Sequence, residues 1–164
     1  MRIPRFRELS EAECLTMLGR NHVGRLAFAH DRRVEIEPIH YVSWEGWIFG
    51  RTSAGDKVEA LRHRPWVAFE VDEVRSMFDW KSIVVHGTIY FLTEDGAPVQ
   101  RQEFERAVDM LRAFMPETLT AEDPVPWRTT VFGLHIADVS GRAAEMARTR
   151  AGRGSRSRAE RAGA

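Results

Sequence analysis

Apolar and polar residues alternate along several short stretches of the chain, and this pattern predicts β-strands. Val34 and Ile36 alternate with glutamates, a period of two that is typical of a strand with one buried face. The other stretches are rich in β-branched and aromatic residues and are bounded by turn-forming residues. The predicted strands cover residues 22–29, 34–42, 47–50, 66–71, 82–92 and 130–137.

Three further segments carry apolar residues at the spacing of an α-helix. Ser10 and Glu13 have the spacing of a capping box, which predicts the start of a helix. Ser53 and Asp56 repeat this spacing before a second segment of helix-forming residues. The predicted helices cover residues 10–19, 56–63 and 99–115.

The order of these elements predicts the fold class. Six strands with three short helices at the strand ends favour an α+β fold built on an antiparallel sheet or barrel. A length of 164 residues is close to that of one domain, and we find no internal repeat. We therefore expect residues 1–146 to form a single domain.

Charge is distributed unevenly although the total is balanced. The chain has 24 basic and 24 acidic residues, but residues 142–164 contain seven arginines and two glutamates. After Met146 no apolar residue is larger than alanine, so this segment has little surface to bury. We expect residues 147–164 to be a disordered basic tail, either simply solvated or in weak nonspecific contact with nucleic acid.

The apolar content also restricts the location of the protein. The chain contains no run of 18 or more apolar residues, the length needed to span a bilayer, and its N-terminal residues are too charged for a secretory signal. The single cysteine, Cys14, excludes an intrachain disulfide and lies in a predicted amphipathic helix, where a buried apolar role is expected. These features favour the cytoplasm and no contact with a membrane.

One loop between a predicted strand and a predicted helix has the composition of a phosphate site. Arg51 and Lys57 supply positive charge, Thr52 and Ser53 supply hydroxyl donors, and Gly55 allows backbone N–H groups to approach an anion. The loop matches neither the Walker A nor the dinucleotide-binding glycine pattern. An ordinary capped helix start with solvated cations is the alternative interpretation.

Several ordered motifs together carry a resemblance to a known family. In chain order these are Gly24-Arg-Leu-Ala27, Glu37-Pro-Ile-His-Tyr41, Ile48-Phe-Gly-Arg-Thr-Ser-Ala-Gly-Asp-Lys57, Val67-Ala-Phe-Glu-Val-Asp72 and Asp79-Trp-Lys-Ser-Ile-Val-Val-His-Gly87. Over residues 10–142 the chain resembles the pyridoxamine 5′-phosphate oxidase-like split-barrel flavoproteins. Within them it is most similar to the flavin-nucleotide-binding proteins of the nitroimidazole-resistance type. The resemblance implies a six-stranded antiparallel split β-barrel with short flanking helices.

The resemblance also implies a cofactor and an assembly. Members of this family bind FMN at a homodimer interface. The phosphate would be held by Arg51, Thr52, Ser53, Gly55 and Lys57. The backbone of Pro38, Ile39 and His40 would lie along the isoalloxazine edge, and Trp80 and Ser82 would approach the flavin from the neighbouring sheet. FAD or a deazaflavin would share the phosphate loop but would need more room.

Two functions are compatible with this resemblance. As an FMN-dependent oxidoreductase, the protein would pass electrons from NADH or NADPH to a small acceptor such as a nitroaromatic or a quinone. As a non-catalytic module, it would store or sense flavin and contact nucleic acid through its tail. The substrate-binding basic residues of the true pyridoxamine phosphate oxidases are absent, which argues against that reaction. The resemblance favours the enzyme.

Histidine is the remaining candidate for catalysis or metal binding. The six histidines form no pair at a spacing of two or four residues, and one cysteine cannot form a thiolate pair, so no metal site is expected. His40 is the last of the expected flavin-edge residues, and its side chain would face the substrate, where an imidazole can donate a hydrogen bond. A structural histidine packed in its strand is the alternative.

Overall fold

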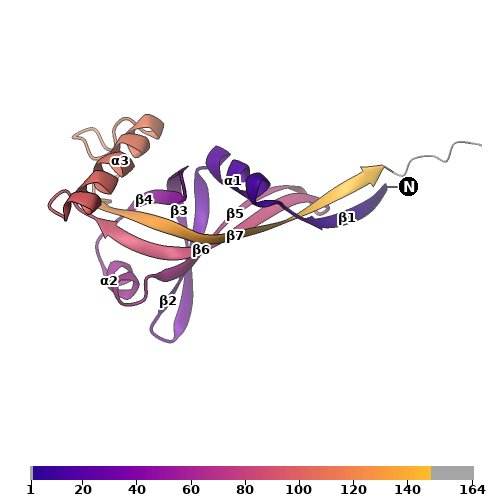
Figure 1. The fold of residues 1–164 in the computed structure, drawn as a ribbon, viewed down its shortest axis with the longest axis horizontal. Helices are drawn as coiled ribbons and strands as arrows, with labels where there is room; N and C mark the ends of the chain where they lie inside the picture. The colour runs from indigo at the N-terminus through magenta and orange to yellow at the C-terminus, as the bar shows by residue number, and fades with distance from the viewer. Residues whose placement is uncertain (1, 149–164) are drawn as a thin grey trace, which may run out of the picture.

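The computed structural model describes residues 2–148, and these form one seven-stranded antiparallel sheet with three helices (Figure 1). The α+β class and the split-barrel architecture are confirmed, but the predicted count of six strands is wrong. The strands are β1 Arg2–Glu8, β2 Val23–His30, β3 Arg33–Trp44, β4 Trp47–Thr52, β5 Trp66–Ser76, β6 Asp79–Leu92 and β7 Thr130–Arg148. The helices are α1 Glu11–Arg20, α2 Asp56–His63 and α3 Pro98–Phe114.

The barrel is closed by β7. The strand order is β1-β7-β4-β3-β2-β5-β6, and an additional pairing of β7 with β6 joins the ends of the six strands β2–β7 into a ring. The strand missed by the sequence analysis, β1, lies outside this ring and pairs with residues 142–148 of β7. Figure 1 shows β1 and the end of β7 extending together as an arm.

The last strand is much longer than predicted. It continues past residue 137 to Arg148, so the first two residues of the expected tail are part of a strand. The remainder of that segment, residues 149–164, lies outside the described residues. None of the helices in residues 2–148 is long and apolar enough to cross a membrane.

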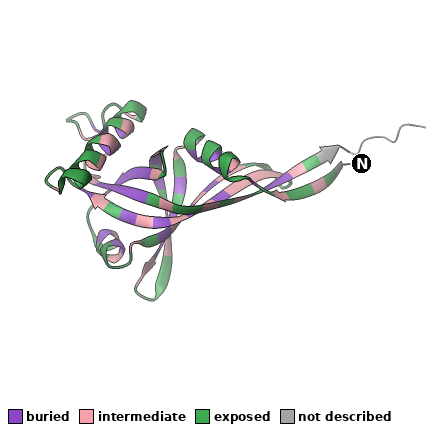
Figure 2. Cartoon of the chain, viewed as in Figure 1, coloured by how far each residue is buried: buried purple, intermediate pink, exposed green. Residues whose placement is uncertain are grey.

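The main core fills the barrel and is closed by α1. Cys14, Met17 and Leu18 of this helix are at most 1% exposed and pack against strand residues such as Phe69. Figure 2 shows that buried positions alternate with more exposed ones along the strands of the barrel. The hydroxyl of the buried Tyr41 donates a hydrogen bond to the carbonyl of Leu18 over 2.8 Å. Because that bond satisfies a helix-end carbonyl, it fixes the position of α1 over the barrel.

A second apolar cluster attaches α3 to the outside of the barrel. Ala107, Val108 and Leu111 of α3 are buried against Val42 and Phe49 of the β3–β4 hairpin. The hydrophobic stripe predicted for this helix therefore faces the sheet. The position of α3 determines which part of the outer barrel surface remains uncovered.

The two predicted capping boxes have different outcomes. At α1, Ser10 accepts from the Glu13 backbone and Glu13 accepts from the Ser10 backbone, as predicted. At α2 the prediction was wrong, because the N-cap is Gly55 and no side chain caps the helix. Gly55 has a φ of 144°, a conformation that side chains rarely adopt, so the glycine rather than Ser53 determines the start of α2.

Gly87 lies at a close approach of the β6 and β7 backbones. The register between these strands shifts between His86 and Gly87, and a Cβ on Gly87 would lie 2.1 Å from the His135 carbonyl oxygen. We expect Gly87→Ala to lower the free energy of unfolding by about 1–3 kcal/mol, the usual cost of overpacking. Urea denaturation measures this change.

Gly19→Ala is the matched control for that substitution. The nearest atom to its added Cβ is 3.9 Å away, and alanine favours the helix by about 0.5–1 kcal/mol, so the control should be slightly stabilised. Equal stability of the Gly87→Ala and Gly19→Ala variants would contradict the proposed close approach.

Candidate functional site

Several of the predicted flavin-binding residues lie on one outward-facing side of the barrel. In an antiparallel sheet, residues directly opposite each other share a face. Arg25 on β2 is opposite both Pro38 on β3 and Glu70 on β5, and Asp72 on β5 is opposite Ser82 on β6. We call this surface the open face; it comprises Pro38, His40, Arg25, Glu70, Asp72, Trp80 and Ser82, all of them exposed or half-buried.

On the open face, two strands lie between the two groups of predicted residues. β3 carries Pro38 and His40, β6 carries Trp80 and Ser82, and β2 and β5 lie between them. Three strand steps of about 4.8 Å correspond to roughly 14 Å. Within one chain, these two groups are therefore not in contact.

Charged side chains occupy the middle of the open face. Arg25 forms ion pairs with Asp72 and with Glu70, the latter over 3.1 Å, and the Ser82 hydroxyl donates to Glu70 over 2.8 Å. The hydrogen bond from Arg25 to Asp72 is the main cause of a raised Arg25 pKa. Sequence reasoning did not find this network, because it depends on the pairing of β2 with β5.

A cavity of about 410 Å³ lies where α3 and the loop after it meet the edge of the open face. Its lining includes Val23, His40, Arg51, Leu111, Phe114 and Val125. The cavity brings together two predicted site residues, His40 and Arg51. Phe114, which the sequence analysis did not select, also stacks on the His22 ring with centroids 4.1 Å apart. Apolar walls with a few polar groups are typical of sites for small flat molecules.

Arg51, which lines this cavity, is held by a buried ion pair. Its guanidinium donates to both carboxylate oxygens of Asp123, and the side chains are 6% and 1% exposed. Asp123 also accepts from the backbone N–H groups of Leu119 and Val125, at 2.7 and 2.9 Å. The Arg51 hydrogen bonds and these backbone contacts hold the pKa of the Asp123 carboxyl well below its usual range. The pair thereby fixes the loop that forms one wall of the cavity.

The remaining predicted phosphate residues lie at the start of α2. Thr52 follows Arg51 in β4 and is buried, whereas Ser53 and Gly55 are exposed in the loop. Lys57, on the first turn of α2, forms an ion pair with Glu37 of β3. The structure therefore brings Lys57 to the flavin-edge strand, whereas the guanidinium of Arg51 is paired with Asp123.

Ile39 and Trp80 complete the predicted set. The Ile39 side chain is buried in the main core, so only its backbone is accessible from the open face. Trp80 lies 6.4 Å from the Phe6 ring and, with Ser82, lines a groove of about 540 Å³ on the open face. The exposed aromatic side chain of Phe6 belongs to the strand that the sequence analysis missed.

Metal-binding groups are not clustered in the described part of the chain. Among residues 2–148, no three His, Cys, Asp or Glu side chains are close enough together to hold a metal ion. His86 instead pairs with Asp138 across β6 and β7 at 3.1 Å.

The comparisons with known proteins identify the family. Residues 10–143 match the family model described as pyridoxamine 5′-phosphate oxidase. This match covers most of the chain, so the protein belongs to the pyridoxamine 5′-phosphate oxidase family, as the motifs predicted. An uncharacterized protein of Rhizobium meliloti is 31% identical over 81 residues, which are 49% of this chain and 54% of that protein. The chain thus spans about half the length of this curated relative.

Solved structures support the same fold. A FAD-binding protein from Mesorhizobium loti has 29% sequence identity and a TM-score of 0.67, covering 84% of this chain and 96% of its own. A nitroimidazole antibiotic resistance protein from Bacteroides thetaiotaomicron has 13% identity and a TM-score of 0.66, covering 87% and 90%. This second likeness concerns the fold alone.

The Arg51–Asp123 pair gives a prediction for stability and its pH dependence. Asp123→Asn keeps the shape of the side chain but leaves a buried cation without a counter-charge, which is strongly destabilising. We expect a Tm several degrees below that of the wild type at pH 7. Thermal unfolding measures this difference, and Glu122→Gln, in an exposed neighbouring residue, is the control.

The difference in Tm between the wild type and Asp123→Asn should decrease in acid. A lowered pKa in the folded state stabilises the fold above the ordinary aspartate pKa of about 3.9, and this contribution is lost as the pH falls through the lowered pKa. Asp123→Asn has no such contribution to lose. A Tm difference that stays constant from pH 7 to pH 2 would argue against the ion pair.

Proposed function

We propose that the protein is an FMN-dependent oxidoreductase that reduces a small acceptor with electrons from NADH or NADPH. The main support is the cavity beside the open face, which combines apolar walls with His40 and Arg51 next to the β3 edge predicted to contact a flavin. Its 410 Å³ suits part of a flat ring system, and the α2 loop supplies Lys57 and free helix N-terminal donors for a phosphate. The residues present therefore fit a flavin mononucleotide.

The contributions of the protein chain follow from this placement. A bound flavin would accept a hydride from a reduced nicotinamide and pass electrons to the acceptor. Lys57, Ser53 and the α2 backbone would hold the phosphate, while Phe114 and its neighbours would exclude water from one side of the ring. His40 would donate a hydrogen bond to the acceptor. Because the redox chemistry would belong to the flavin, no side chain is required to act as a catalytic acid.

We also propose that the functional unit is a homodimer. Pro38 and His40 are roughly 14 Å from Trp80 and Ser82 within one chain, at about 4.8 Å per strand step, so one isoalloxazine ring in contact with both groups would take them from two copies with their open faces together. Light scattering should give twice the subunit mass of 18.8 kDa. A monomer at micromolar concentration in the presence of FMN would overturn this assembly.

The first prediction of the proposed function concerns cofactor affinity. Removal of a charge-assisted contact to a phosphate costs about 1.5–3 kcal/mol, so Lys57→Ala should weaken FMN binding roughly 10- to 150-fold. Quenching of FMN fluorescence measures the affinity. Arg62→Ala, at the other end of α2, is the control and should bind FMN normally. A wild-type protein that does not quench FMN at all would exclude the proposed cofactor.

The second prediction concerns turnover. FMN-loaded protein should oxidise NADH or NADPH with a nitroaromatic or quinone acceptor faster than free FMN does. His40→Ala should lower kcat at least tenfold, equivalent to about 1.4 kcal/mol, with unchanged FMN affinity. Normal turnover with a lowered Tm would instead assign His40 a structural role.

The alternative, a flavin-binding module without catalysis, has its own expected outcome. Such a protein would bind FMN but give no turnover above free FMN. If retention on heparin were also lost after deletion of residues 147–164, the basic segment would be a nucleic-acid contact.

A further inference from the structure

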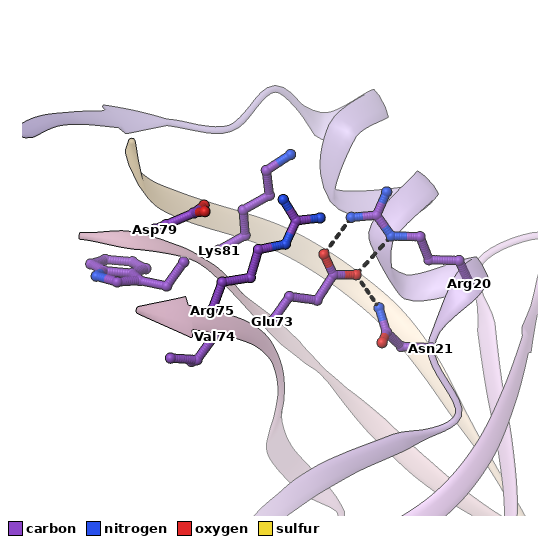
Figure 3. A pocket seen from close by; sticks show the side chains of 8 residues that line it. Arg20, Asn21, Glu73, Val74, Arg75, Asp79 and Lys81 are labelled. Atoms are coloured by element: carbon purple, nitrogen blue, oxygen red, sulfur yellow. Dashed lines mark hydrogen bonds and ion pairs between the residues drawn. The ribbon is translucent and has the colours of Figure 1, made fainter. Parts of the chain in front are cut away.

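A second pocket lies on the opposite side of the β5–β6 hairpin from the open face. It has a volume of about 520 Å³ and is formed by the end of α1 and the turn end of this hairpin (Figure 3). Glu73 on β5 and Lys81 on β6 are directly opposite each other and share the pocket side. None of the roles proposed above uses these residues.

Cations outnumber acids in this pocket. Its lining includes Arg20, Arg75, Lys81, Asn21, Glu73 and Asp79. In Figure 3, the side chains of Arg75 and Lys81 extend toward the same region as the head group of Arg20. Three cations face two carboxylates, and this excess of positive charge favours an anionic ligand.

The carboxylate of Glu73 already accepts hydrogen bonds from Arg20 at the end of α1 and from Asn21, the residue after the helix. Its two carboxylate oxygens accept from Arg20 at 2.7 and 2.5 Å, and one of them also accepts from the Asn21 amide at 2.7 Å. The Arg20 hydrogen bonds, with help from Asn21, lower the Glu73 pKa. Glu73 therefore stays charged and hydrogen-bonded to Arg20, while the charge of Lys81 acts on it from a longer distance, without an ion pair.

Arg75 and Lys81 form no ion pair with any of residues 3–146, the part of the chain whose side chains are described. Lys81 is nevertheless half-buried, lines the pocket and lies close enough to Glu73 to lower the pKa of that carboxyl. A guanidinium and an ammonium together match the two negative charges and multiple acceptor oxygens of a phosphate.

Trp80 connects this pocket to the open face. It lines the second pocket and also the open-face groove that contains Ser82. The volume of about 520 Å³ is larger than a single phosphate needs, so the pocket has room for the group that carries the phosphate.

We propose that this second pocket binds a phosphate-bearing ligand through Arg75 and Lys81. Two sources carry this chemistry: the adenylate half of FAD, reaching past Trp80 from a flavin on the open face, or a separate phosphorylated small molecule. The FAD source rests on the proposed flavin function, whereas the separate molecule does not.

The test uses the full chain in a phosphate-free buffer of low ionic strength. Inorganic pyrophosphate is titrated calorimetrically, and FMN and FAD affinities are measured by fluorescence quenching. The variant is Arg75→Ala combined with Lys81→Ala. Its control is Arg32→Ala combined with Arg101→Ala, which removes the same charge from exposed residues elsewhere.

We expect the pocket variant to bind pyrophosphate at least tenfold more weakly, with the control unchanged and with wild-type affinity falling as salt increases. Weaker FAD binding with unchanged FMN binding in the same variant would support the dinucleotide as the source. Unchanged affinity for both flavins would support a separate phosphorylated molecule.

Two results distinguish an error in the proposed phosphate pocket from an error in the proposed flavin function. No pyrophosphate binding by the wild type, or equal binding by the pocket variant, would overturn the second pocket whatever the flavin data show. A wild type that binds pyrophosphate but neither flavin would leave the pocket supported and contradict the proposed function. Lys81→Arg should retain most of the pyrophosphate affinity, because it keeps the charge.

Discussion

The fold depends on how β7 shares its two edges. One edge pairs with β6 along most of its length, while the other pairs first with β4 and then with β1. Between these partners, the Ile136 N–H donates to Gly46 and the Gly141 carbonyl accepts from Leu9, both over 2.9 Å. A strand edge can pair with only one neighbour at a time, so β1 pairs with β7 beyond the end of β4 and lies outside the ring of strands.

Elements with strong local signals could be predicted from the sequence. All three helices and the six barrel strands were found, because periodicity, capping and β-branched runs are properties of neighbouring residues. β1 was missed because Pro4 and alternating arginines resemble a solvated terminus. The end of β7 was missed because it is rich in alanine, and Ala143 and Ala144 are buried only through their partner strands.

The candidate site was less accessible to such reasoning. The loop residues and the flavin-edge strand were selected from composition and resemblance, and the structure places Lys57 beside Glu37 of that strand. The partner of Arg51 is 72 positions away in the sequence, and no local pattern identifies it. The separation of His40 from Trp80 follows from the order β3-β2-β5-β6, which pairing across the whole chain determines.

The position of Cys14 has a consequence for a protein proposed to handle electrons. Cys14 is the one cysteine of the chain, it is 0% exposed, and its sulfur lies where a side chain on Gly141 would have to be, 2.8 Å from an added Cβ. Burial raises the pKa of the Cys14 thiol, so the reactive thiolate is scarce at neutral pH. Reduced flavins release peroxide when oxygen intercepts their electrons, and peroxide attacks exposed thiolates first. With its sulfur sealed between α1 and β7, the folded protein would tolerate its own oxidising by-products without forming sulfenic acid or cross-linked chains.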